Sequence, residues 1–233
     1  MELKSERTVD MEQTTYNPDA PEMDFRAVHE AEMKVEFERQ RKYQLQLRDA
    51  KCRKIIPPDY YTWDESRFPP EWQKIKDWKF GRKGILLVGP TNNHKSRMAC
   101  AIGKMQFLAG RSLAYYDGIG FGVAISKAFA NPDITEEWLA LVCKVDILII
   151  DDLFKRSPSD VQSEGIYCVY ERRKANILPT ITTLNATAAT MKELMLAATK
   201  GGDAKVNDIH EPLVRRIREN TIQIGFKTTG GGK

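Results

Sequence analysis

Short apolar segments alternate with segments of helical periodicity along most of this chain. The apolar runs "ILLV" at residues 85–88 and "ILII" at residues 147–150 are nearly continuous, which is typical of strands buried on both faces of a parallel sheet. Strand-like segments also occur at "SLAYYD", "PTITTLN" and "TIQIGF". Because helical segments separate these strands, the pattern predicts an α/β fold in which helices flank a parallel five-stranded sheet.

The segments between the expected strands contain apolar residues at helical spacing. We expect helices at residues 95–108, 118–130, 135–144, 159–175, 191–199 and 211–219. No internal repeat interrupts this order, so the strands and helices belong to one main domain.

The composition argues against membrane insertion and secretion. The chain is 42% hydrophobic and 29% charged, and no apolar stretch approaches the length of a transmembrane helix. Its first residues, "MELKSERTVDMEQ", contain no apolar core of the kind found in signal peptides. The four cysteines show no metal-ligand spacing and are expected to be free thiols in a reducing cytoplasm. The net charge of +4 permits a DNA partner without requiring one.

The region before the main domain changes character twice. Residues 1–25 are mostly acidic and polar, which predicts disorder. Residues 26–54 contain strong helix formers and many charges, which predicts a charged helical arm. The arm is either a solvated appendage or a partner-binding handle for a protein or DNA, and the residues alone leave both open. We assign residues 55–227 to the main domain and residues 228–233 to a flexible tail.

The segment "GPTNNHKSR" follows the first apolar strand and leads into a helix. It matches the phosphate-binding pattern G-x-x-x-x-G-K-[ST] except that His94 replaces the second glycine. Asn and His tolerate the left-handed backbone that such glycines supply, so Asn92 and His94 could preserve the loop. The loop and the helix N-terminus would surround phosphates with positive potential, while a lysine adds charge and a hydroxyl binds magnesium. The predicted nucleotide-binding residues are Gly89, Pro90, Thr91, Asn92, Asn93, His94, Lys95, Ser96 and Arg97.

The segment "DILIIDDL" is an apolar strand that ends in two carboxylates, Asp151 and Asp152. We expect Asp151 to hold Mg²⁺ together with Ser96, and Asp152 to polarise the attacking water. Two turn-favouring aspartates at a strand end are the simpler alternative. The order of loop, strand, helices and second strand favours the catalytic interpretation.

Two further segments supply candidate catalytic residues. The strand "PTITTLN" is expected between the first two, and the amide of Asn185 at its end could orient the water. The helix "EPLVRRIREN" carries Arg215, Arg216 and Arg218. One of these arginines could stabilise negative charge on a neighbouring subunit's nucleotide, although a solvated basic face would have the same sequence.

With these elements in order, the sequence resembles the AAA+ ATPases of the DnaC/IstB type, which are replicative-helicase loaders and transposition helpers of bacteria and phages. The resemblance runs from Ile55 to Phe226, and its marks are "IPPDYYTW", "GPTNNHKS", "ILIIDDLF", "YERRKANILPTITTLN" and "EPLVRRIRE". It implies a P-loop NTPase core that hydrolyses ATP with Mg²⁺. It also implies a homo-oligomer on DNA that loads or remodels a replicative helicase or a transposase.

The same resemblance implies roles for individual residues. Asn185 would sense the γ-phosphate, and Arg216 would be the arginine finger, with Arg215 and Arg218 as rivals. Arg173, in "YERRKA", matches a recurring family arginine, and the resemblance leaves open that it too faces a neighbouring subunit. The chain stops soon after "TIQIGF", which leaves no room for the C-terminal lid domain found elsewhere among AAA+ proteins.

Three functions are compatible with these features. The first is an ATP-driven loader or transposition helper. The second is a nucleotide-binding adaptor with weak or no hydrolysis, because His94 makes the loop degenerate. The third is a DNA-binding protein in which ATP sets only the oligomeric state. A working ATP site is favoured by the joint presence of Lys95, Ser96, Asp151, Asp152, Asn185 and Arg216.

Overall fold

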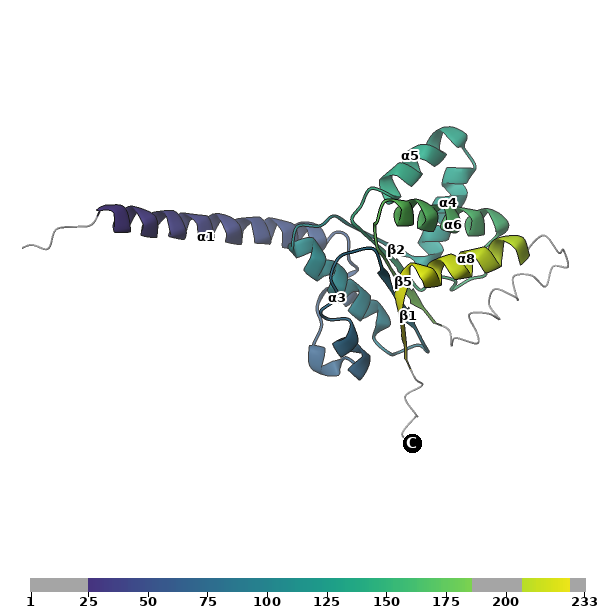
Figure 1. Ribbon diagram of the computed structural model, residues 1–233, viewed down its shortest axis with the longest axis horizontal. Coiled ribbons are helices and arrows are strands. Elements are labelled where there is room, and N and C mark those ends of the chain that lie inside the picture. The colour runs from purple at the N-terminus through teal and green to yellow at the C-terminus, as the bar shows by residue number, and fades with distance from the viewer. Residues whose placement is uncertain (1–24, 186–206, 227–233) are drawn as a thin grey trace, which may run out of the picture. The chain divides into compact units, whose positions relative to one another are not determined.

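The computed structural model describes residues 25–185 and 207–226 (Figure 1). The helix expected at residues 191–199 and the flexible tail expected at residues 228–233 lie outside these ranges, as do residues 1–24 of the tail expected to be disordered. Its last residue, Phe25, instead begins a helix. Contacts divide the chain between Gln44 and Leu45 into two units, which are described separately. The division falls inside helix α1 (Phe25–Cys52), whereas the sequence analysis began the main domain at Ile55. The last turns of α1 belong to the larger unit because Cys52 is buried in its core.

In the smaller unit, α1 is a solvated, highly charged helix. Its apolar side chains are exposed rather than packed, among them Val28, Met33, Val35 and Phe37. Among residues 25–44, the described part of this unit, no apolar stripe is buried, so the helical state of this segment rests on good local helix formers. Across the part of the chain that the structure describes, no helix combines the length and the apolar character needed to cross a bilayer.

The larger unit is built on a parallel sheet of five strands, in the order β2-β3-β4-β1-β5. These strands are β1 (Gly84–Val88), β2 (Leu113–Asp117), β3 (Ile147–Asp151), β4 (Thr180–Leu184) and β5 (Thr221–Gly225). Every neighbouring pair is parallel, so the predicted fold class is confirmed. As expected, β4 lies between β1 and β3, and all of its residues are buried.

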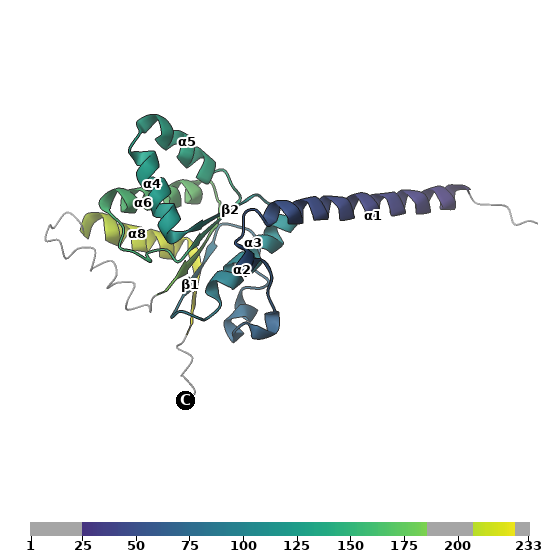
Figure 2. The ribbon, with the colours of Figure 1, turned by 180° about the vertical axis from the view of Figure 1, so that it is seen from behind.

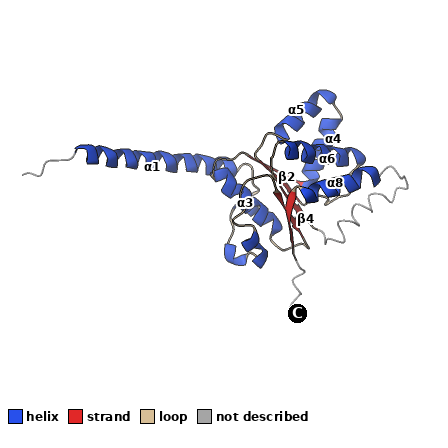
Figure 3. Cartoon of the chain, viewed as in Figure 1, coloured by secondary structure: helices blue, strands red, loops and turns tan. Residues whose placement is uncertain are grey.

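Helices cover both faces of the sheet (Figures 1 and 2). One face packs against α3 (Lys95–Leu108) and the entry segment, which contains α2 (Pro58–Tyr61) and the 3-10 helices η1 (Glu65–Arg67) and η2 (Pro70–Lys74). The other face packs against α4 (Gly118–Phe129), α5 (Pro132–Val142), α6 (Asp160–Ala175) and α8 (Asn207–Glu219). Figure 3 shows this layering of helices around strands.

Side chains alternate between the two faces along β1. Ile85 and Leu87 lie in the hydrophobic core between the sheet and α3, whereas Leu86 lies in the core on the other face, between the sheet and helices α4, α5, α6 and α8. Both faces of β1 therefore pack against apolar cores, which explains the unbroken run "ILLV". Gly89 follows this strand at a point of close approach. A Cβ at Gly89 would lie 2.6 Å from the Cβ of Phe226, so only glycine lets the end of β1 pack beside β5.

Helix α5 begins earlier than the sequence analysis expected, at Pro132 rather than at Thr135. The Asn131 side chain accepts a hydrogen bond from the Asp133 backbone, and Pro132 occupies the first helical turn. Asn is a favoured N-cap residue and proline a favoured first residue, so these local signals fix the start. Ser159 forms a capping box with Gln162 at the start of α6 in the same way.

Candidate nucleotide-binding site

The loop between β1 and α3 retains the backbone shape of a phosphate-binding loop despite its missing glycine. Asn92 has φ 66° and His94 has φ 55°, both in the left-handed region. Asn and His adopt this region more readily than most residues, as the sequence analysis proposed. Helix α3 begins at Lys95, directly after His94. The free backbone N–H groups of its first turn therefore lie beside the loop and provide an anion site.

A cavity of about 530 Å³ lies at this loop. Its lining contains most of the nucleotide-binding residues predicted from the sequence, together with Asp152 and Asn185. Tyr60 and Arg67 of the entry segment also line it, and the sequence analysis missed both. The full lining is Tyr60, Arg67, Thr91, Asn92, Asn93, His94, Lys95, Ser96, Arg97, Asp152 and Asn185. The cavity thus joins the loop, the end of β3 and the end of β4.

Lys95 is 4% exposed and lies in the cavity wall. Its Nζ donates a hydrogen bond of 2.6 Å to the Pro90 carbonyl oxygen. Burial lowers the pKa of Lys95, while the charges of Asp152 and Asp151 oppose that shift. No ion pair joins Lys95 to a carboxylate within the described residues, so an anion in the cavity would offset the cost of burying this charge.

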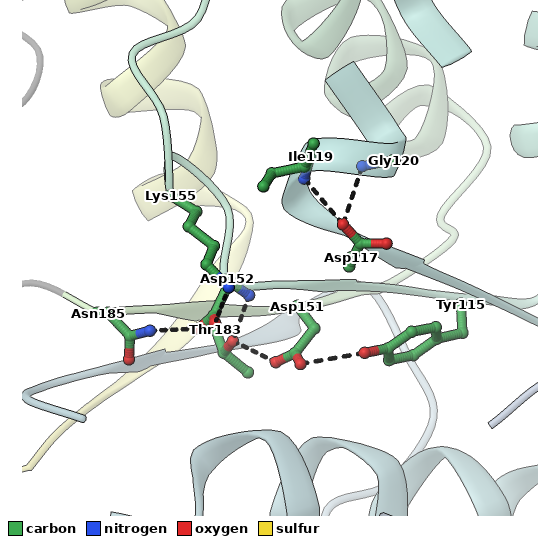
Figure 4. Close-up of polar contacts among 9 residues, drawn as sticks. All are labelled: Tyr115, Asp117, Ile119, Gly120, Asp151, Asp152, Lys155, Thr183 and Asn185. Atoms are coloured by element: carbon green, nitrogen blue, oxygen red, sulfur yellow. Dashed lines mark hydrogen bonds and ion pairs between the residues drawn. The ribbon is translucent and has the colours of Figure 1, made fainter. Parts of the chain in front are cut away.

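The two aspartates occupy different environments at the carboxyl end of β3 (Figure 4). Asp151 is buried, and its carboxylate accepts hydrogen bonds from Thr183 Oγ1 at 2.6 Å and Tyr115 Oη at 3.1 Å. The Asp152 backbone N–H donates to Thr183 Oγ1 at 2.8 Å. Asn185 Nδ2 donates to the Asp152 carboxylate at 2.5 Å. Neighbouring strands β2 and β4 therefore fix the orientation of both carboxylates.

Asp152 is the more accessible of these two carboxylates. Burial, followed by the charge of Asp151, raises the pKa of the Asp152 carboxyl. Lys155 opposes the shift, with its Nζ 3.9 Å from the Asp152 carboxylate. A carboxylate with a raised pKa is a better proton acceptor than an ordinary aspartate. Burial and the Asp151 charge raise the pKa of Tyr115 in turn, so its hydroxyl stays protonated and donates.

Thr183 and Tyr115 were not assigned roles from the sequence. Thr183 lies in the polar run "TITTLN", in which only the amide of Asn185 was predicted to be functional. In the structure, the Thr183 hydroxyl lies between Asp151 and Asp152 and hydrogen-bonds with both. Tyr115 stands in "LAYYD", where nothing local separates it from an ordinary strand tyrosine. The register Tyr115↔Ile149 and Asp117↔Asp151 between β2 and β3 brings it within reach.

The three candidate finger residues lie on α8, and none lines the described cavity. Arg216 is 18% exposed and forms ion pairs within the chain, with Glu171 of α6 and with Glu219 at 3.1 Å. Arg215 is 68% exposed and lies 3.8 Å from Glu219. Arg218 is also exposed. An Arg216 that served a neighbouring subunit would first have to release its two glutamates.

Arg173 corrects an expectation from the family resemblance. It is 1% exposed and cannot face a neighbouring subunit. Its guanidinium donates hydrogen bonds to five acceptors inside the same chain. These are the backbone oxygens of Val142, Val145, Asp146 and Pro179, and Thr180 Oγ1. The residue instead ties the end of α5, the start of β3 and the start of β4 to α6.

No model of a protein family matches this chain, and no curated protein sequence does. Several solved structures have a similar fold. The DnaC helicase loader aligns with a TM-score of 0.54 at 18% identity, covering 73% of this chain and 100% of that one. The described part of this chain therefore shares the fold of that structure, a parallel five-stranded sheet flanked by helices.

DnaI aligns with a TM-score of 0.54 at 20% identity, covering 74% of this chain and 92% of that one. AMPPCP-bound DnaA from Aquifex aeolicus aligns at 0.55 and 14% identity, covering 74% of this chain and 51% of that one. The aligned part thus spans about half the length of the DnaA structure. At these identities the likeness establishes a fold shared with these structures, as the motifs predicted, and nothing finer.

Proposed function

We propose that this protein is a magnesium-dependent ATPase that acts in replication initiation as a loader of a replicative helicase. The observation that carries the proposal is the cavity in which the loop, Asp152 and Asn185 meet. Three separate chain segments deliver a phosphate-binding loop, a carboxylate and an amide to one place. That is the set of groups that phosphoryl transfer to water requires.

The residues of this cavity fit a magnesium nucleotide. Lys95 and the first turn of α3 would hold the phosphates, since both present positive charge to the same cavity. Ser96, which lines the cavity, and Asp151, which is buried next to Asp152 and does not line it, would bind Mg²⁺, which prefers oxygen ligands. The bound ion would neutralise charge that develops on the phosphates. Asp152, oriented by Asn185, would accept the proton of the attacking water.

A second cavity of about 270 Å³ suits the base of the nucleotide. It shares Arg67, His94 and Arg97 with the first cavity, so the two adjoin. Trp63 and Phe68 line it as well, and the rings of Phe68 and His94 lie 6.2 Å apart. Aromatic and cationic side chains together favour a planar heterocycle.

The role in replication is inferred from the solved structures of similar fold, which include a DnaC helicase loader and DnaA bound to AMPPCP and single-stranded DNA. We accordingly propose a replicative helicase and DNA as partners, and a homo-oligomer formed with ATP. A transposase remains the alternative partner, in keeping with the motif resemblance. His94 favours a second function, a nucleotide-dependent adaptor with slow hydrolysis, because its left-handed backbone costs about 1 kcal/mol or more.

Two substitutions test whether binding and chemistry reside where we place them. Lys95→Ala removes the buried charge and should abolish binding of a fluorescent ATP analogue in the presence of magnesium. Asp152→Asn should bind the analogue as wild type does but reduce turnover by about 100-fold or more. The exposed Lys74→Ala, outside the cavity, is the matched control and should change neither quantity. Equal loss of binding in the Lys95 and Asp152 variants would contradict the assigned roles.

The proposed partner is tested separately. Turnover should rise with single-stranded DNA, and more at low salt, because phosphate contacts depend on ionic strength. A wild-type protein that binds nucleotide tightly but shows no turnover with or without DNA would establish the adaptor function instead.

A further inference from the structure

Residues 25–44 of α1 expose an unusual amount of apolar surface for a solvated helix. Val28 is 42% exposed, Val35 is 67% exposed and Tyr43 is 58% exposed. A single helix of this length is only marginally stable in water, and most helices in proteins are stabilised by packing of an apolar face. The exposed apolar side chains therefore favour a partner that covers them.

One face of this segment carries an apolar stripe. An open hollow lies along it, between side chains spaced by three or four residues: Val28, Ala31, Glu32, Val35 and Glu36. Residues three and four apart lie on the same side of a helix, so Arg39 and Tyr43 continue the stripe towards the C-terminus. The small side chain of Ala31 leaves room for a second helix to approach closely.

The charge of the segment changes sign along its length. Residues 30–38 contain four acidic residues and one basic residue, whereas residues 39–44 contain three basic residues and no acidic one. None of these charged side chains forms an ion pair within the part of the chain that the structure describes. Two such helices in parallel would bring like charges together, whereas antiparallel helices would bring opposite charges together.

We propose that residues 28–43 of two copies of this chain pair as antiparallel helices along the apolar stripe. When Glu32 of one copy faces Arg39 of the other, Val28 faces Tyr43 in the same register, because both positions shift by four residues in opposite directions. Two-fold symmetry repeats each contact, and the two copies of Val35 lie together at the centre. The pairing needs no nucleotide, so it goes beyond the oligomer proposed to form with ATP.

Sedimentation velocity of the full chain without nucleotide tests the pairing. The paired stretch is about 24 Å long, so we expect a concentration-dependent dimer that weakens as salt screens the ion pairs. Arg39→Glu replaces two ion pairs with two like-charge contacts and should raise the dissociation constant about ten-fold or more. Arg41→Glu is the matched control. It makes the same change of charge about 200° away around the helix and should leave the dimer unchanged.

A charge exchange tests the direction of the helices. Glu32→Arg should weaken the dimer as much as Arg39→Glu does. Mixing the two variant proteins should restore association, because both contacts then join an arginine to a glutamate. The double variant Glu32→Arg with Arg39→Glu should also associate as wild type does. In a parallel pair, like charges would already face each other at both positions in the wild-type protein, so neither single substitution would weaken it.

The apolar centre is tested in the same experiment. Val35→Asp places two carboxylates beside the two-fold axis and should abolish the dimer. Phe37→Asp is the control, because Phe37 is also exposed, at 68%, but lies about 200° around the helix from Val35. The Phe37 variant should associate as wild type does, and a loss of association in this variant alone would overturn the assigned face.

Three other results would overturn the proposal. The first is a wild-type protein that is monomeric at every concentration without nucleotide, which would leave the stripe to a different partner. The second is a dimer that neither Glu32→Arg nor Arg39→Glu weakens. The third is equal weakening by Arg39→Glu and Arg41→Glu, which would reduce the effect to net charge. None of these measurements contains nucleotide, so failure of the ATP site and failure of the helix pair are distinguishable.

Discussion

Replacing Arg173 should destabilise the protein strongly, although its neighbour Arg172 can be replaced at little cost. Arg173→Met retains most of the aliphatic volume but leaves five buried acceptors without their donor. Each unsatisfied buried group costs about 1 kcal/mol or more, although the costs are not fully additive. We therefore expect a loss of about 3–5 kcal/mol, a large part of the roughly 5–15 kcal/mol that stabilises a typical domain.

Urea unfolding followed by tryptophan fluorescence measures this loss directly. A protein of this size should also show a fall in Tm of about 10 °C, given about 2–4 °C for each kcal/mol. Arg172→Met is the matched control on the next residue of α6. Arg172 forms a bidentate pair with Glu136, at 2.8 Å and 2.7 Å, but the pair is exposed, so its removal should cost no more than about 1 kcal/mol.

The alternative, that Arg173 serves a neighbouring subunit, gives the opposite result. Arg173→Met would then fold with nearly unchanged stability, while turnover per subunit would stop rising with protein concentration. A stability loss below about 1 kcal/mol would refute the reasoning from its five acceptors. Equal losses in the Arg172 and Arg173 variants would refute it as well.

Three further outcomes are expected. His94→Gly should raise nucleotide affinity or turnover modestly in calorimetry with magnesium, because glycine adopts φ 55° without strain. If the glycine variant binds nucleotide and the wild-type protein does not, the loop of the natural chain has lost its function. If Arg216 is the finger, turnover per subunit should rise with protein concentration, and mixing Arg216→Ala with Asp152→Asn should restore activity in part; restoration by Arg215→Ala instead would transfer the role to Arg215. The hydrogen bond from Tyr61 is the main cause that lowers the pKa of Asp49 in the folded protein. The stabilisation from this carboxylate is therefore complete above the pKa of Asp49 in the unfolded chain and is lost as pH falls through its lower pKa in the folded protein. Asp49→Asn removes this titration, so the free energy of unfolding should change less with pH below about pH 4.

The sheet could be predicted from the sequence largely because β1 and β3 are buried on both faces. Strands of this kind favour continuous apolar runs, and few other structures produce "ILLV" and "ILII" between turn residues. The meeting of Lys95, Asp152 and Asn185 followed from the same sheet. Parallel strands deliver their carboxyl ends to one edge, so residues that end different strands meet there. The observed order β2-β3-β4-β1-β5 brings them together as expected.

Arg173 and Tyr61 were not predicted correctly because their roles depend on side-chain contacts with segments that are distant in the sequence. Arg173 looks like a surface arginine in "YERRKA", and only the fold surrounds it with five acceptors from other elements. Tyr61 meets Asp49 because α1 extends into the core, which no local signal marks. A side-chain partner many residues away leaves no trace in local periodicity or composition, so contacts of this kind had to come from the structure.

Backbone strain in this chain is concentrated where the sequence departs from ordinary local preferences. Within the described residues, four of the five non-glycine residues with positive φ lie in the two loops at the site: Asn92, His94, Asp152 and Phe154. Each such residue costs about 1–3 kcal/mol unless its surroundings hold it in place. Thr183 holds Asp152 through its backbone N–H, and the entry segment packs Phe68 near His94. A loop that had lost its function would be free to relax this strain, so its retention at both loops is itself an argument that the cavity binds a ligand.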